Sequence, residues 1–284
     1  MSTRIPVLKT YKLYIGGQFP RTESGRAIAL EGRGGRHVAN YCRASRKDLR
    51  NAVVAARKAQ SGWAGKTAYL RGQILYRTAE MLEGRAAQFA EELRLQGDSA
   101  SGARKEVDAA IELLIHYAGW TDKYTQVFGT VNPVASPHFN FSVPEPTGVI
   151  GVVAPESPGL LGLVAGVAPL IAGGNACVVL ASATHPLSAV TFAEVLNDSD
   201  LPGGVVNILT GLRQEILPTM ATHKDIDGIA AYGTNAAEQT LIAENAALNV
   251  KRVALHPADA LDGDPFRIME FQEIKTTWHP VAIR

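Results

Sequence analysis

The second half of the chain alternates short apolar runs, rich in β-branched residues, with stretches long enough to form a helix. Five such runs are separated by turn-forming and helix-length segments: Val149–Ala154, Ala176–Ala181, Val205–Thr210, Gly228–Tyr232 and Lys251–Leu255. Strands that alternate with helices form a parallel sheet, and right-handed crossovers place helices on both of its faces. The pattern therefore predicts an α/β fold whose core is a parallel sheet of about five strands within residues 147–258.

Helix-start signals agree with this pattern. Ser157 precedes Pro158, which we place in the first turn of a helix, and Asn235 precedes an alanine-rich stretch. In the first part of the chain, Ser45 begins a sequence that resembles a capping box, and apolar residues recur at helical spacing after it.

Residues 1–129 as a whole are predicted to form an N-terminal helical segment packed on the sheet. A second amphipathic helix is expected to begin near Thr67, and a third is expected to include residues 107–118. Each has one apolar side. Leu13–Phe19, with Gly16 and Gly17 at its centre, predicts a small hairpin.

Two segments far apart in the chain have the period of two that is typical of strands. Residues 138–143 alternate aromatic and polar side chains, and Glu273–Trp278 is also interpreted as a strand with a period of two. We expect residues 130–146 and the linker and strand of residues 259–284 to form a ribbon. A small ribbon has open hydrogen-bonding edges and is marginal in water. A partner subunit is therefore expected, in a homo-oligomer (dimer or tetramer) or a hetero-oligomer.

Charge and composition exclude several classes of protein. The 284 residues contain 28 Lys and Arg against 27 Asp and Glu, which argues against a protein that binds nucleic acid or a membrane surface through bulk charge. Residues 157–193 contain no charged Asp, Glu, Lys or Arg, but Pro158, Pro169 and Gly173 divide this run into pieces too short to span a bilayer. Two Cys cannot form a disulfide framework, and the N-terminus shows no targeting pattern, so we expect a cytoplasmic protein.

Several short motifs, in a fixed order, resemble those of the aldehyde dehydrogenase superfamily. They are Ser45–Trp63, Gly72–Ala79, Tyr117–Trp120, Glu145–Gly151, Leu201–Asn207 and Glu273–Thr276. The resemblance covers Tyr11 to about Leu255 and then the C-terminal tail. In this family a Rossmann-like domain binds NAD or NADP, a separate domain supplies the catalytic Cys, and a two-part ribbon joins subunits. The resemblance implies the same fold, cofactor class and ribbon here.

The departures from the family pattern concern its chemistry. In the family, the strand that aligns with Lys251–Leu255 is followed by Glu-Leu-Gly-Gly-Lys and then by the domain that carries the nucleophile. Here His256 stands at the position of the general-base Glu, the tail follows almost at once, and no Cys occurs after Cys177. The chain is thus similar to the truncated second unit of double-length aldehyde dehydrogenases, and we predict no catalytic residue in it.

The cofactor positions are altered as well. By resemblance the vestigial cofactor-binding residues are Pro155, Ser157, Gly211, Gly233 and Thr234. Ser157 replaces the family's Asn that donates to the oxyanion. The Lys and Glu that contact the adenosine ribose are replaced by Leu180 and Ala183, and Glu238 replaces the second Gly of the phosphate turn. Glu156, placed at a helix start, would repel a pyrophosphate. We predict no bound cofactor, with NAD or NADP as the alternative.

The remaining reactive side chains favour structural interpretations. We place Cys42 in a loop and Cys177 in a buried strand, and the seven His are too scattered to form a metal site. His256 as a replacement base would lack a nucleophile.

Three functions stay open: a non-catalytic subunit that assembles with itself or with an active aldehyde dehydrogenase, an NAD-dependent aldehyde oxidoreductase, and a nucleotide-binding sensor without catalysis. The first is the main hypothesis because the sequence keeps the ribbon while it lacks the catalytic Cys and Glu.

Overall fold

The core of the molecule is a five-stranded parallel sheet. The computed structural model describes residues 9–32 and 35–281. The sheet has the order β7-β6-β5-β8-β9. Its strands are β5 (Val149–Val153), β6 (Ala176–Leu180), β7 (Val206–Leu209), β8 (Gly228–Tyr232) and β9 (Arg252–His256). The predicted sheet is confirmed, and each strand lies within one residue of the expected run.

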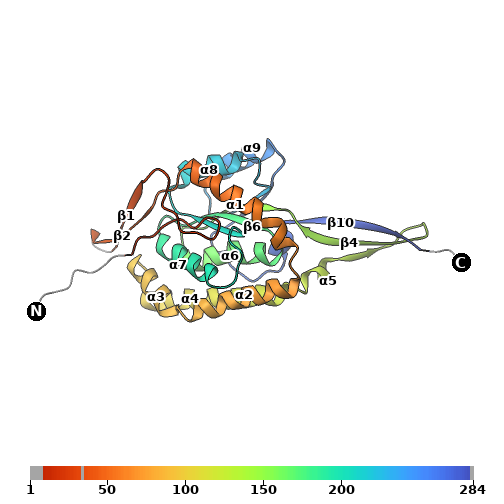
Figure 1. Cartoon of the computed structure of the whole chain (residues 1–284), viewed down its shortest axis with the longest axis horizontal. Coiled ribbons are helices and arrows are strands. Elements are labelled where there is room, and N and C mark those ends of the chain that lie inside the picture. Colours follow the sequence, from red (N-terminus) through yellow and green to blue (C-terminus); the bar gives the residue numbers. More distant parts are fainter. Residues whose placement is uncertain (1–8, 33–34, 282–284) are drawn as a thin grey trace, which may run out of the picture.

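Helices cover both faces of this sheet (Figure 1). On one face lie α6 (Gly159–Ala172) and α7 (Pro186–Asn197), and on the other lie α1 (Arg46–Ala64), α8 (Arg213–Thr222) and α9 (Ala236–Ala247). Successive side chains of a strand point to opposite faces. Ile150 and Val152 therefore join the core under α6, while Val149 and Val153 join the core under α1. This is why the strands read as continuous apolar runs.

Four further helices come from the N-terminal part of the chain: α2 (Ala68–Glu83), α3 (Ala86–Leu95), α4 (Ala100–Trp120) and α5 (Tyr124–Phe128). Of the N-terminal helices, α1 packs directly on the sheet, whereas α2 and α4 pack on each other and on α6. The expectation that all the N-terminal helices lie on the sheet was therefore wrong for these two. Every residue of α6 except Leu161 is buried, so this helix needs neighbours on the side away from the sheet as well.

A small hairpin near the N-terminus was not predicted. It consists of β1 (Ala27–Glu31) and β2 (His37–Cys42). Cys42 is the buried last residue of β2, so its placement in a loop was wrong. The small hairpin predicted over Leu13–Phe19 is present only as a turn closed by one isolated antiparallel bridge between Ile15 and Gln18, without flanking strands.

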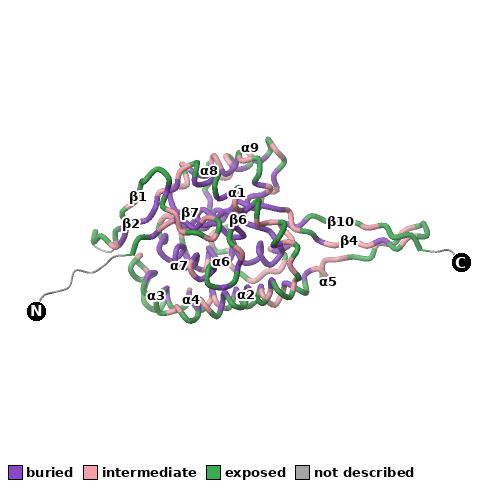
Figure 2. Tube along the Cα trace, in the orientation of Figure 1, coloured by how far each residue is buried: buried purple, intermediate pink, exposed green. Residues whose placement is uncertain are grey.

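The ribbon is a three-stranded antiparallel sheet of order β10-β4-β3 that projects from the body (Figure 1). It contains β3 (Thr130–Asn132), β4 (His138–Pro146) and β10 (Gln272–Pro280), and α10 (Phe266–Met269) precedes β10. The predicted pairing of residues 138–143 with the C-terminal strand is confirmed, and the short β3 is an addition. Figure 2 shows that much of the ribbon is exposed beyond the buried core of the body.

The uncharged run of residues 157–193 does not form a single long helix. It folds as α6, β6 and most of α7, with breaks at Pro158 and Gly173 as predicted. Pro169 was expected to divide the run as well, but it lies inside α6. Within residues 9–32 and 35–281, no helix has both the length and the apolar character that a bilayer crossing requires.

Candidate functional site

The sheet has a topological switch point at β5. From β5 the order continues to β6 and β7 on one side and to β8 and β9 on the other. Open α/β sheets bind ligands outside the carboxyl ends of their strands at such a point. The loops at residues 154–158, 181–185 and 233–235 follow β5, β6 and β8 and define this crevice. Four of the five predicted cofactor positions lie in these loops, and Gly211 follows β7 at the same edge.

Pro155 and Ser157 have different surroundings. Pro155 is buried against α6, where a Cβ added to Gly162 would lie 2.2 Å from Pro155 Cγ. Ser157 is exposed. The helix begins at Gly159 with Pro158 as its N-cap, so the placement of Pro158 in the first turn was wrong by one residue.

The retained glycines have structural roles. Gly233 has a φ of 60°, and a Cβ on it would lie 2.9 Å from the Cβ of Ala258. A Cβ on Gly211 would come within 3.1 Å of the backbone nitrogen of Ala44. Thr234 is buried, and its Oγ1 has no hydrogen-bond partner among the described residues. These close contacts within the fold are sufficient to require glycine at positions 211 and 233, whether or not a phosphate binds there.

Arg213, which the sequence analysis did not single out, lies in the crevice. It is the first residue of α8, and its side chain is only 11% exposed. The guanidinium donates to the carbonyl oxygens of Ala154 and Gly233, at the ends of β5 and β8. It also pairs with Glu156, with 3.1 Å between Nε and Oε1, and with Glu238, with 3.6 Å between Nη1 and Oε2. No local sequence pattern signals a contact that joins three loops.

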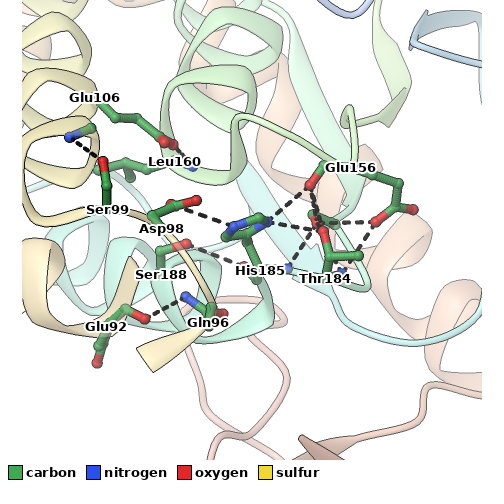
Figure 3. A network of polar contacts seen from close by, with 12 residues as sticks. Glu92, Gln96, Asp98, Ser99, Glu106, Glu156, Leu160, Thr184, His185 and Ser188 are labelled. Atoms are coloured by element: carbon green, nitrogen blue, oxygen red, sulfur yellow. Dashed lines mark hydrogen bonds and ion pairs between the residues drawn. The ribbon is translucent and has the colours of Figure 1, made fainter. Parts of the chain in front are cut away.

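Glu156, which the sequence analysis places at a helix start, directs its carboxylate to the loop after β6. Its Oε2 accepts from the backbone nitrogen of Ala183 at 2.8 Å and from that of Thr184 at 3.2 Å (Figure 3). The hydroxyl of Ser182 donates to the same oxygen at 3.1 Å. These donors belong to the loop after β6, where the family carries its ribose-binding Glu at the position of Ala183. Leu180, the other altered ribose position, is fully buried.

A buried histidine lies beside this loop. His185 precedes α7, and its Nδ1 lies 3.0 Å from the carbonyl oxygen of Glu156 and 2.9 Å from the hydroxyl of Thr184 (Figure 3). Its Nε2 lies 3.5 Å from a carboxylate oxygen of Asp98. The loop after β6 is thus held by side chains from two other elements.

His256, at the family's general-base position, is enclosed by the linker between β9 and β10. Its side chain is 8% exposed, and its Nε2 lies 3.0 Å from Oε2 of Glu270. Arg267 contacts the other ring nitrogen, Nδ1, at 2.5 Å. The imidazole also lies against the ring of Tyr232, with 4.7 Å between centroids. Because its neighbours occupy both ring nitrogens, His256 has no free nitrogen with which to take a proton from a substrate.

Neither cysteine resembles a nucleophile. Cys177 lies in β6 with no exposed surface, and burial raises the pKa of its thiol far above the usual range. Cys42 is buried at the end of β2. A nucleophilic cysteine needs an accessible thiolate and a neighbouring base or cation, and Cys177 lacks the access. Within the described part of the chain, no three His, Cys, Asp or Glu gather as a metal site would require.

The crevice residues do not fit the pyrophosphate of a nicotinamide dinucleotide. Such a group needs free backbone N–H donors at a helix start and a positive local charge. Here Glu156 uses the donors of residues 183 and 184, and Arg213 is already paired with two carboxylates. We derive no step through this cofactor.

Comparison with known proteins identifies the family of most of the chain. Residues 23–257 match the model of the aldehyde dehydrogenase family. The chain is 31% identical to a mitochondrial benzaldehyde dehydrogenase of Antirrhinum majus over 88% of its own length and 47% of that protein. It is 32% identical to an aldehyde dehydrogenase of Alternaria alternata over 86% of its length and 49% of that protein. The chain therefore spans about half the length of these curated relatives.

Solved structures agree with the sequence comparisons. Aldehyde dehydrogenase C of Pseudomonas syringae, a mutant in complex with NAD+ and octanal, superposes with a TM-score of 0.81 and 34% identity over 87% of this chain and 50% of that chain. An NAD+ complex of aldehyde dehydrogenase from Bacillus cereus gives a TM-score of 0.83 and 27% identity over 88% and 51%. Each superposition covers about half of the relative's chain. Together with the family match over residues 23–257, they show that the chain belongs to the aldehyde dehydrogenase family.

Proposed function

We propose that this chain is a non-catalytic aldehyde dehydrogenase-like subunit that assembles with itself or with an active aldehyde dehydrogenase. The observation that carries the proposal is the connection between β9 and β10. Only residues 257–271 separate the last sheet strand from the ribbon strand. In the family, by the resemblance, the domain that supplies the catalytic Cys occupies this position. The chain thus keeps a ribbon while the segment before it is too short to form a domain.

The groups that remain near the crevice support a non-catalytic role. Covalent catalysis on an aldehyde needs a nucleophile and a base within hydrogen-bond reach of each other. Cys177 lies inside the sheet, and His256 is held by Glu270 and Arg267. Residues of the linker between β9 and β10 therefore hold His256, which occupies the position of the family's general base.

The ribbon supports the assembling role. Ile274 and Trp278 lie on one of its faces, and both are exposed. Phe139 and Phe141 lie on the opposite face, with 5.6 Å between ring centroids, and Phe139 is exposed. Exposed apolar side chains on both faces, together with the open edges of β3 and β10, are features that a partner subunit would cover.

The test is the mass of the native assembly. Light scattering at micromolar concentration is expected to give a mass of at least twice the 30.3 kDa of one chain, alone or mixed with a full-length aldehyde dehydrogenase. The double variant Phe139→Ser/Trp278→Ser should shift the mass toward one chain. The matched control Tyr69→Ser/Tyr76→Ser removes two exposed aromatic side chains from α2 and should leave the mass unchanged. A monomer under both conditions would contradict the proposal.

An NAD-dependent aldehyde oxidoreductase is the alternative that family membership favours. It predicts reduction of NAD with an aldehyde such as benzaldehyde or octanal, which the names of two relatives supply as probes. We expect no turnover by the purified chain. Turnover that survives substitution of both cysteines would require a different nucleophile and would reject the non-catalytic proposal.

A further inference from the structure

We infer that the dinucleotide crevice of this chain is closed from within, and that Arg213 and the carboxylates around it occupy the place of a cofactor's phosphates. The inference concerns nucleotide binding and is independent of whether the chain assembles. It rests on three helix starts at one sheet edge and on the charges between them.

The first helix start is that of α6, directly after the central strand β5. A helix N-terminus has unpaired backbone N–H groups that suit a phosphate. Here Oε1 of Glu106, which comes from α4, accepts from the nitrogen of Leu160 at 2.6 Å and from that of Leu161 at 3.2 Å (Figure 3). A carboxylate of the chain itself therefore takes the position that a ligand's oxygen would need.

The second helix start is that of α7. The loop before it donates two backbone N–H groups, from Ala183 and Thr184, to the carboxylate of Glu156. The nitrogen of Leu187 donates to Oε1 of Gln96 at 2.9 Å. These contacts come from two different elements, so the donors of this helix start are engaged from both sides.

The third helix start is that of α9, which corresponds to the family's Gly-rich phosphate turn. Asn235 and Glu238 form a capping box in which each side chain accepts from the other residue's backbone nitrogen, both at 3.0 Å. Glu238, which replaces the family's second Gly, therefore caps the N-terminus of α9. A phosphate here would meet a carboxylate instead of free N–H groups.

Arg213 joins two of these helix starts. It contacts Glu156 at the loop before α7 and Glu238 at the start of α9, and it donates to the carbonyl ends of β5 and β8. A guanidinium alone would attract a phosphate. Two carboxylates against one guanidinium leave this part of the crevice with a net negative charge, which repels the doubly charged pyrophosphate of a dinucleotide.

The inference predicts which substitutions open the crevice. Glu156→Gln/Glu238→Gln keeps the size of both side chains and an oxygen acceptor on each, but it leaves Arg213 without a carboxylate partner. Inorganic pyrophosphate should then bind at least tenfold more tightly than to the native chain. The further change Arg213→Gln should abolish the gain. Glu80→Gln, which removes one charge from the exposed surface of α2, is the matched control and should bind like the native chain.

The measurement is isothermal titration calorimetry together with thermal unfolding in millimolar pyrophosphate, NAD+ and NADP+. The native chain should give no binding heat and no change in Tm, whereas the folded double variant should gain Tm with pyrophosphate. If the double variant fails to fold, Glu238→Gln alone is used, because Asn235 still caps α9. Submillimolar binding of NAD+ or NADP+ to the native chain would overturn the inference. So would a folded variant that gains no affinity for pyrophosphate.

Discussion

Oε1 of Glu106 lies 2.6 Å from the backbone nitrogen of Leu160, so a side chain of α4 closes the first turn of α6. The contact joins the outer helical layer to the helix that follows the central strand. Pro158, at the N-cap of α6, offers no side-chain hydrogen bond to this turn. Glu106 therefore supplies the acceptor that a Ser, Asp or Asn at the N-cap would normally supply.

Glu106→Ala is expected to lower the free energy of unfolding by about 1–2 kcal/mol, because it removes the acceptor of two N–H groups in the first turn of α6, that of buried Leu160 and that of partly buried Leu161. Glu106→Gln keeps an oxygen at the same place and should lose less than half of that amount. Urea unfolding monitored by circular dichroism measures both. The exposed substitution Glu112→Ala on the same helix is the control and should change stability little. Equal losses for Glu106→Ala and Glu106→Gln would reject a capping role.

The pH dependence of stability, compared between the native chain and Glu106→Gln, tests the burial of the Glu106 carboxyl group. Burial is the largest influence on Glu106 and raises the pKa of its carboxyl above the usual value. The folded state therefore holds this proton to higher pH than the unfolded state does. The raised pKa therefore adds to the free energy of unfolding below the pKa of about 4.3 that a Glu has in the unfolded chain. This addition is lost as the pH rises through the pKa of Glu106 in the folded chain. The stability of the native chain relative to Glu106→Gln should fall across this interval, and a flat difference would contradict it.

The strands and several helix starts were predictable because their causes are local. Continuous apolar runs such as 149–153 and the capping boxes at Ser45 and Asn235 are each encoded within a few residues. The contacts that close the crevice are of a different kind. Arg213 lies 57 residues from Glu156, and Glu106 lies 54 residues from Leu160, so no period or motif signals them. The direction of a side chain across elements depends on the assembled fold.

Asn175 is expected to be essential for joining the ribbon to the body. It has no exposed surface, its Oδ1 accepts from the nitrogen of Gly148 at 2.8 Å, and its Nδ2 donates to the carbonyl of Phe271 at 2.9 Å. Asn175→Ala leaves the buried N–H of Gly148 without an acceptor, whereas the carbonyl of Phe271 keeps the N–H of Thr147 and Nε2 of Gln272 as donors. We expect a loss of about 1–3 kcal/mol in the free energy of unfolding. Asn51→Ala, on the exposed side of α1, is the control. Thermal unfolding compares them, and a similar Tm for the two variants would show that the contact contributes little.

The two cysteines should be unreactive in the folded chain. Cys177 lies in β6 of the parallel sheet, and Cys42 is buried as the last residue of β2. Only a thiolate reacts quickly with a disulfide reagent, and burial both excludes the reagent and raises the pKa of the Cys177 thiol.

Titration with a chromogenic aromatic disulfide should therefore label neither thiol on the timescale of free cysteine, and both should react once denaturant unfolds the chain. Cys42→Ser and Cys177→Ser, measured separately, assign each reaction. Rapid labelling of one thiol in the folded chain would reveal an accessible thiolate. Because such a group is what aldehyde oxidation requires, that single result would also reopen the oxidoreductase alternative.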